Sequence, residues 1–236
     1  MNVARIIPAI VRGYFTAFVD GIVEGSLPEN NGPQKVEPRQ MKQLLLEHYE
    51  EVSKYLYTSA FDAIAIVCYD SHEELEQRLR SADPKSLDAM TLMKHACRTE
   101  QDFMLMADEY RRNFYALLAG HVMNAEEYFE VINDEFMPLE EGEVKAERAI
   151  RAVVMAVIRG YQSGRRCVDA HTRQVNVVSV YRLLVDNMQT LLHNQPVVTP
   201  DDIDLNELFL AVCKTPENMN VMLESMQQVM HGLAEE

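Results

Sequence analysis

The chain has few of the residues that interrupt secondary structure or that form flexible linkers. Its 236 residues include nine glycines and nine prolines, and no long serine or glycine tract. Only two stretches are rich in loop-forming residues, 27–38 and 138–143. We therefore expect a single domain over residues 1–236, with a candidate sub-boundary near 138–143.

Motifs that specify a reaction, a nucleotide or a metal are also missing from the sequence. It has no glycine-rich phosphate loop and no Cys-x-x-Cys pair. Asp202, Asp204 and Asn206 match the first three positions of a calcium loop, but Glu207 and Cys213 stand where that loop needs glycine and glutamate. Because a helix N-terminus attracts acids through its dipole, we expect no metal there. The sequence predicts no enzyme activity and no cofactor.

An apolar N-terminal stretch, residues 3–23, is too often interrupted by charge to span a membrane. Arg5, Arg12, Asp20 and Glu24 break it up, and its longest uncharged run is residues 13–19. A membrane-spanning helix needs about 20 apolar residues. Arg12 and Arg159 each lie next to a glycine in an apolar helical run, so each is expected to have a carboxylate or carbonyl partner.

The four cysteines are far apart and lie in or beside apolar runs: Cys68, Cys97, Cys167 and Cys213. Widely spaced cysteines of this kind are typical of buried, reduced thiols. We therefore place the protein in a reducing compartment, the cytoplasm.

Helical signals recur along the whole chain. Apolar residues at three- and four-residue intervals, as over 6–23, predict buried helix faces. Capping signals such as Thr99 with Asp102, and Thr215 before Pro216, mark helix starts. The pattern predicts an all-α, multi-helix globular bundle of roughly ten helices, near 3–25, 38–69, 72–81, 84–98, 100–123, 125–136, 143–164, 174–194, 201–213 and 216–233. Residues 62–69 and 175–181 are the only strand-like segments, and both are predicted to be helical.

Two of the predicted helices resemble each other. Residues 6–17 and 153–164 align without gaps and share Ala9/Ala156, Arg12/Arg159, Gly13/Gly160 and Tyr14/Tyr161. Both carry small residues at every fourth position, which allows a second helix to approach closely. The two segments are expected to pack on each other or to play equivalent parts in two packed helical halves; coincidence between two buried helices is the alternative.

Charge is distributed very unevenly. Residues 145–182 hold eight of the 22 basic residues and only two of the 37 acidic ones, in a chain of net charge −15. This patch predicts an anionic partner or docking on acidic protein. The arginines expected to bind a partner are Arg148, Arg151, Arg165, Arg166 and Arg173, with Gly164 ending a helix and exposing the two that follow it.

A row of methionines completes the candidate binding residues. Met219, Met222, Met226 and Met230 share one side of the last predicted helix, where flexible thioethers suit either a partner helix or an ordinary core. Together these features predict a non-enzymatic protein-interaction component, an adaptor, assembly or regulatory protein. It would bind a protein partner or a second copy of itself through the basic patch and the apolar face of its N-terminal or C-terminal helix. The alternative is a nucleic-acid-associated protein that uses the 145–182 arginines on phosphates.

Overall fold

The computed structural model describes residues 1, 3–26, 43, 63–69, 73–74, 77, 94, 96–118, 144–169, 172, 175–193, 196–198 and 203–235. All regular structure in these ranges is helical, and none of these residues belongs to a strand. The all-α prediction is therefore confirmed, including the helical prediction for the described parts of 62–69 and 175–181.

Six helices have defined bounds: α1 (Val3–Ser26), α6 (Glu100–Leu118), α8 (Ala146–Val168), α9 (Val177–Leu192), α10 (Leu205–Cys213) and α11 (Pro216–Glu235). Residues 63–68 form a further helical segment. The described helices do not support the expected count of roughly ten. The helices expected over 72–81, 84–98 and 125–136, and the sub-boundary near 138–143, lie largely or wholly outside the described residues.

Side-chain caps fix two helix starts at the predicted residues. The Asp102 amide donates to the Thr99 hydroxyl at 3.1 Å and the Thr99 amide donates to the Asp102 carboxylate at 3.3 Å, which forms a reciprocal capping box at α6. The Asn218 amide donates to the Thr215 hydroxyl at 3.2 Å and caps α11.

Two other helices begin later than the sequence pattern indicated. α9 and α10 start at Val177 and Leu205 rather than near 174 and 201. Asn176 and Asp204 have extended backbones, and their side chains accept from the first free amides of the two helices. These caps set the boundaries because a polar side chain there replaces the missing intrahelical acceptors.

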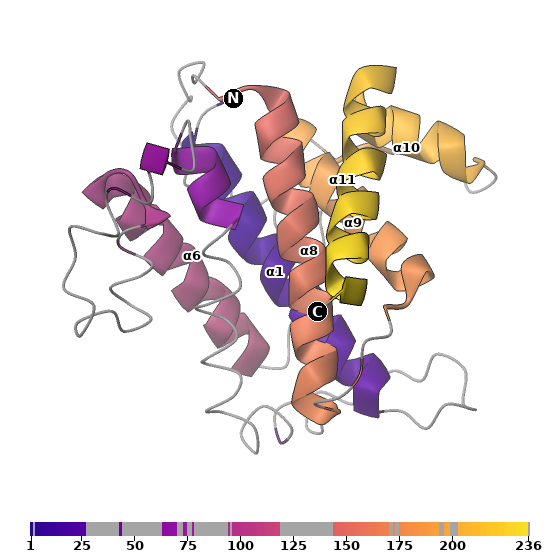
Figure 1. Cartoon of the computed structure of the whole chain (residues 1–236), viewed down its shortest axis with the longest axis horizontal. Coiled ribbons are helices and arrows are strands. Elements are labelled where there is room, and N and C mark those ends of the chain that lie inside the picture. Colours follow the sequence, from indigo (N-terminus) through magenta and orange to yellow (C-terminus); the bar gives the residue numbers. More distant parts are fainter. Residues whose placement is uncertain are drawn as a thin grey trace.

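α1 and α8 form the centre of the fold, where they lie side by side and run in the same direction (Figure 1). At one end the amino group of Met1 donates to the Val144 carbonyl oxygen at 2.5 Å. At the other end Gly25 lies against the side chain of Val168. The similar segments 6–17 and 153–164 are therefore neighbours, and the prediction that they pack on each other is confirmed.

Small residues bring the two backbones into direct contact, which we call the α1–α8 seam. A Cβ atom on Gly21 would overlap the carbonyl oxygen of Tyr161, and one on Gly164 would overlap the carbonyl oxygen of Phe18. Gly160 meets the backbone of α1 in the same way. No side chain fits at these positions, because protein interiors are close-packed and neither backbone can move aside alone.

The other described helices cover this central pair (Figure 1). α6 packs on α1, α9 contacts both α1 and α8, α11 lies on α8, and α10 packs on α9 and α11. Arg5–Ser26 is apolar and long enough to cross a membrane by length and composition alone, but 83% of its most apolar window is buried inside the protein. In this fold α1 is a core helix.

The charge of Arg12 is buried between α1 and α9. Its side chain is 3% exposed and its guanidinium donates to the hydroxyl of Thr190. Burial raises the pKa of nearby Asp186, whereas the charges of Arg12 and Arg182 act to lower it. One partner of Arg12 is thus a hydroxyl, where a carboxylate or carbonyl was expected, and the carboxylate of Asp186 is close enough to interact with its charge. Arg159 is half-buried on α8 and also has an interaction partner.

A second polar cluster joins the end of α1 to the start of α9. The Glu24 carboxylate accepts from the Tyr161 hydroxyl at 2.5 Å, from the Asn176 amide at 3.1 Å and from the Ser179 hydroxyl. Burial, and then the hydrogen bond and charge of Glu24, raise the pKa of Tyr161. Since α1 meets α9 in antiparallel order, the two clusters hold α9 at both ends.

Candidate interaction surface

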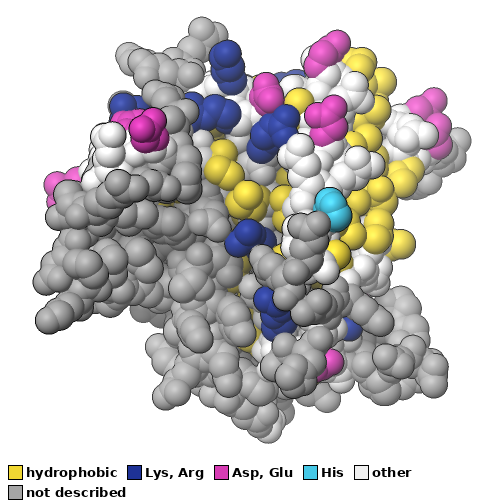
Figure 2. Space-filling model, in the orientation of Figure 1, with side chains coloured by type: hydrophobic (Ala, Val, Ile, Leu, Met, Phe, Trp, Pro, Cys, Tyr) yellow, Lys and Arg dark blue, Asp and Glu magenta, His cyan; other side chains and the backbone are white. Residues whose placement is uncertain are grey.

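The basic residues of α8 follow its outer side. Arg148, Arg151, Arg159 and Arg166 are half-buried, whereas most of the intervening residues are buried. Figure 2 shows dark blue side chains near the top of α8 and more of them down its length. The sequence thus places a basic stripe on this helix, and what each arginine contacts decides whether it is available to a partner.

Arg148 is used inside the protein. Its guanidinium donates to the carbonyl oxygens of Ile66 at 2.8 Å, Val67 at 3.2 Å and Tyr69 at 2.5 Å. These carbonyls end the helical segment 63–68, where a basic side chain satisfies free acceptors and favours the negative end of the helix dipole. Arg148 therefore fixes that segment to α8.

Arg151 joins α8 to α11. Its guanidinium donates to Glu147 at 3.1 Å, to the Ser225 hydroxyl at 3.4 Å and to Gln228 at 3.3 Å, and it lies 3.9 Å from the Glu224 carboxylate. These contacts occupy most of its donors. Because exposed pairs of this kind contribute little free energy, their main effect is to orient α11 on α8.

The Gly164–Arg166 segment differs from the sequence-based expectation. α8 does not end at Gly164 but continues to Val168, and Gly164 is buried against the backbone of Phe18. Arg165 and Arg166 are consequently half-buried in the last turn of a helix rather than exposed beyond it. The Nε atom of Arg165 is buried and has no hydrogen-bond partner among the described residues, whereas Arg166 has an interaction partner. Arg173 lies outside the described residues.

The methionine row is mainly a core face. Met222 is 0% and Met226 6% exposed, and the sulfur of Met222 lies 3.8 Å from the sulfur of Cys213. Met219 and Met230 are half-buried and pack at the edge of the core. The structure thus divides the predicted row into two buried anchors and two residues that reach the surface.

A continuous apolar surface follows the side of α11 that faces away from α8. Met230 lies two residues beyond Gln228, which is about 200 degrees around a helix, so the two side chains point to opposite sides. Met219, Leu223 and Met230 share that side and are all half-buried. In Figure 2 hydrophobic side chains form a column along the right of α11 and extend toward α10. We call Leu210, Met219, Leu223 and Met230 the α10–α11 surface.

α10 contributes the most exposed large apolar side chains near this surface. Leu205 is 51% and Leu210 41% exposed, and Val198 in the preceding loop is 94% exposed. These residues were not among those predicted from the sequence to bind a partner. The signal was present, because the nine residues of α10 are apolar on more than one side, and only Phe209, Val212 and Cys213 are buried.

Acidic residues dominate the charge of α10 and α11. Residues 203–235 hold one lysine, Lys214, and five carboxylates, which are Asp204, Glu207, Glu217, Glu224 and Glu235. Figure 2 shows magenta side chains both over the upper part of α11 and at the outer end of α10, with the apolar column between them. A surface of this kind repels anions and attracts a basic ligand.

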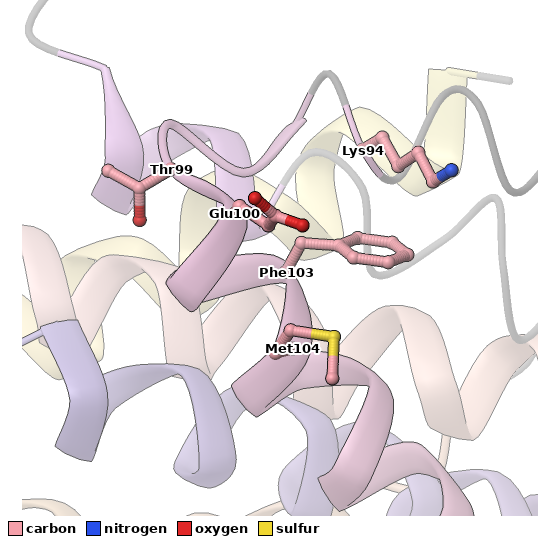
Figure 3. A pocket seen from close by; sticks show the side chains of 5 residues that line it. All are labelled: Lys94, Thr99, Glu100, Phe103 and Met104. Atoms are coloured by element: carbon pink, nitrogen blue, oxygen red, sulfur yellow. The ribbon is translucent and has the colours of Figure 1, made fainter.

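A small pocket lies at the start of α6. Its volume is about 330 Å³, and the described residues Lys94, Thr99, Glu100, Phe103 and Met104 line it (Figure 3). The ammonium of Lys94 lies 5.6 Å from the centre of the Phe103 ring. The Thr99 hydroxyl is already engaged in capping α6, so the lining offers mainly an apolar wall and two opposite charges.

The described residues show no arrangement suited to nucleophilic or metal chemistry. No three of the His, Cys, Asp and Glu side chains among them are grouped as a metal site would require. Burial raises the pKa of Cys68 to about 11 and that of Cys213 to about 12, which keeps both thiols protonated. Burial lowers the pKa of His193, whose ring nitrogen lies 2.9 Å from the Val212 carbonyl oxygen.

Comparison with known proteins found no family model that matches the chain, and no curated protein or solved structure that is similar to it.

Proposed function

We propose that the protein is a helical interaction component, an adaptor, assembly or regulatory protein without catalytic activity, that binds a protein partner in the cytoplasm. The observation that carries the proposal is the α10–α11 surface. Monomeric proteins commonly expose single apolar residues, but a continuous apolar surface with a charged surround is typical of an interaction site. Leu210 and the half-buried Met219, Leu223 and Met230 provide such a surface.

The contacts of the arginines argue against the binding mechanism predicted from the sequence, in which the basic patch of residues 145–182 docks on the partner. Arg148 and Arg151 bind groups within the chain, and Arg182 lies 2.5 Å from Asp20. α1, the other helix considered for apolar contacts, is buried. The C-terminal helices are therefore the better docking elements, and the basic stripe mainly holds the fold together.

Arg165 keeps the nucleic-acid alternative open to test. It is half-buried in the last turn of α8, and no ion pair within the described part of the chain occupies its guanidinium, so it is the arginine of α8 chosen for this test. If that alternative holds, Arg165→Ala lowers the affinity for a generic single-stranded DNA and reduces its salt dependence. If the protein-binding proposal holds, a shift with DNA is absent and the variant behaves as the wild type.

A display selection with a random-peptide library tests the proposed function. The full wild-type chain is expected to enrich a defined set of peptides, and Leu210→Asp is expected to lose them, because a carboxylate replaces an apolar contact. Met104→Asp is the matched control, since Met104 is 53% exposed on α6, away from α10 and α11. Equal enrichment on Leu210→Asp, or no enrichment at all on the wild type, would contradict the proposal.

A further inference from the structure

We propose that the chain is an internal duplication, in which residues 1–118 and 144–235 are two copies of one helical unit, each of which caps a helix of the other. The copies are related by an approximate two-fold axis that lies between α1 and α8 and runs parallel to them (Figure 1). α1 corresponds to α8, the helical segment 63–68 to the end of α9, and α6 to α11.

Equivalent residues of α1 and α8 meet at both ends of the central pair. The Met1 amino group donates to the Val144 carbonyl oxygen, and the Val144 amide donates back to the Met1 carbonyl oxygen at 3.2 Å. These two residues are 143 positions apart. At the far end Gly25 contacts the side chain of Val168, which follows it by the same interval. A two-fold axis between parallel helices produces such contacts, because equivalent residues that face the axis meet each other.

The contacts along the α1–α8 seam are reciprocal in the same register. Gly21 meets the backbone of Tyr161, and Gly164 meets that of Phe18. Gly164 and Tyr161 follow Gly21 and Phe18 by the interval that separates Met1 from Val144. This register differs by one helical turn from the alignment by sequence, which pairs Tyr14 with Tyr161. Both registers fit the sequence, because small residues recur at every fourth position.

The two copies exchange arginines. Arg148 follows Arg5 by the same interval, and each donates to a carbonyl oxygen at the end of a helix in the other copy. Arg5 binds His193, and Arg148 binds Tyr69. His193 and Tyr69 each follow the last residue of their helix, and the amide of each donates four residues back at 3.0 Å. Each copy therefore satisfies free carbonyls of the other. The His193 ring in turn lies 2.9 Å from the Val212 carbonyl oxygen of α10.

α6 and α11 are preceded by equivalent buried cysteines. The sulfur of Cys97 lies 4.0 Å from that of Met106, and the sulfur of Cys213 lies 3.8 Å from that of Met222. The spacing within each pair is nine residues. Both cysteines are buried, so the same sulfur contact joins the start of each helix to the core.

The two helices also begin in the same way. Thr99 and Thr215 each lie two positions after the cysteine, and their hydroxyls accept from the amides of Asp102 at 3.1 Å and Asn218 at 3.2 Å. α6 then packs on α1 as α11 packs on α8. The order of the equivalent helices along the chain is the same in both copies, as a duplication requires.

The correspondence relates the pocket of Figure 3 to the α10–α11 surface. In the register of the two cysteines, Lys94 and Phe103 of the pocket correspond to Leu210 and Met219 of the surface. One copy thus has an ammonium near an aromatic ring at this helix junction, whereas the other has two apolar side chains. The copies have diverged at the place where the proposed function locates binding.

A circular permutant of the full chain tests the duplication. By symmetry the end of α11 lies relative to the start of α1 as the end of α6 lies relative to the start of α8. The permutant begins at Val144, joins Glu236 to Met1 through a flexible Gly-Ser linker of about 25 residues, and ends at residue 143. We expect it to have the helicity of the wild type by circular dichroism. Thiol labelling of Cys97 and Cys213 should remain within about twofold of the wild-type rate.

Paired substitutions test the exchange of arginines. Arg148→Met, in the second copy, is expected to speed labelling of Cys68 in the first copy at least about tenfold, and to leave Cys213 within about twofold. Arg5→Met should have the converse effect, on Cys213 but not on Cys68. Mass spectrometry of the labelled peptides resolves the two thiols. Arg111→Met is the matched control, because Arg111 forms an exposed pair with its helix neighbour on α6 and should affect neither thiol.

Each measurement can overturn the inference independently of the display selection. A permutant that stays unfolded with linkers of about 25 and about 35 residues would show that the two connections are not equivalent. Faster labelling within the arginine's own copy, or an effect of only one of the two arginines, would show that the copies do not cap each other.

Discussion

The α1–α8 seam and the α10–α11 surface are both built from uncharged helix residues, but they lie in different environments. In the seam Gly21, Gly160 and Gly164 meet the backbone of the facing helix. At the α10–α11 surface the side chain of Leu210 faces solvent, and Met219 and Met230 are only half-buried. The seam has its partner within the chain, whereas the described residues cover the α10–α11 surface only in part.

The two regions therefore have different roles in the protein. Glycine positions that admit no side chain specify a single partner at a single distance, which suits a core. Leucine and methionine at a surface tolerate many shapes, which suits recognition. Substitutions in the seam should therefore change stability, and substitutions at the surface should change binding.

The largest effect is expected at the centre of the seam. Gly164→Ala places a methyl group on the carbonyl oxygen of Phe18 and is expected to lower the free energy of unfolding by about 3 kcal/mol or more. The matched control is Gly232→Ala on α11, where a Cβ meets nothing within 4 Å. That variant should stabilise the protein by about 0.5–1 kcal/mol, because alanine favours a helix more than glycine does. Chemical denaturation measures the free energy of unfolding of both variants. A change of the same sign in both would refute the close approach of the two helices at Gly164.

A somewhat smaller loss is expected when Arg12 is removed. Arg12→Met leaves the hydroxyl of Thr190 without its donor and removes one of the two positive charges, Arg12 and Arg182, that act on the half-buried carboxylate of Asp186, which costs about 2 kcal/mol or more at neutral pH. This loss of stability should be smaller at acidic pH. The folded-state pKa of Asp186 is already raised above 3.8 and rises further without Arg12, so protonation favours the folded state.

The stability of the Arg12→Met variant should depend on pH in a direction set by the raised pKa of Asp186. Its stability relative to the wild type should be highest below the ordinary aspartate pKa of 3.8 and should fall as pH rises through the folded-state pKa of Asp186. Denaturation curves at several pH values measure it. Arg12→Met/Asp186→Asn should recover part of the loss at neutral pH, and no recovery would mean that the two charges do not interact.

The smallest stability change is expected at the surface. Leu210→Asp should change the free energy of unfolding by no more than about 0.5 kcal/mol, because the side chain is already 41% exposed. Cys213 reports whether α10 stays in place, since its thiol is buried and its pKa is raised to about 12. Thiol labelling of the folded variant should remain as slow as in the wild type. Rapid labelling would show that the substitution opens the core.

The sequence predicted the all-α class and the packing of the central pair, but not the number of helices. Three- and four-residue spacing located α1 and α8, and the stripes of small residues predicted their contact. Local signals such as Thr99 with Asp102 also located helix starts, because a cap involves residues that are close in the sequence.

Long-range partners and exposure were less predictable. Arg148 binds carbonyl oxygens 79 to 82 residues away, which no local pattern reveals. Gly164 was expected to end a helix, but glycine also permits close helix contact, and the sequence alone does not distinguish these uses. The exposure of Leu210 depends on which sides of α10 are covered by α9 and α11.

Hydrogen–deuterium exchange with a bound peptide tests the central claim most directly. The full chain is measured alone and with the peptide that the display selection enriches most strongly. The account predicts slower exchange over α10 and α11 and unchanged exchange over α8. Protection along α8 with no change over α10 and α11 would contradict it, and would place binding on the basic stripe.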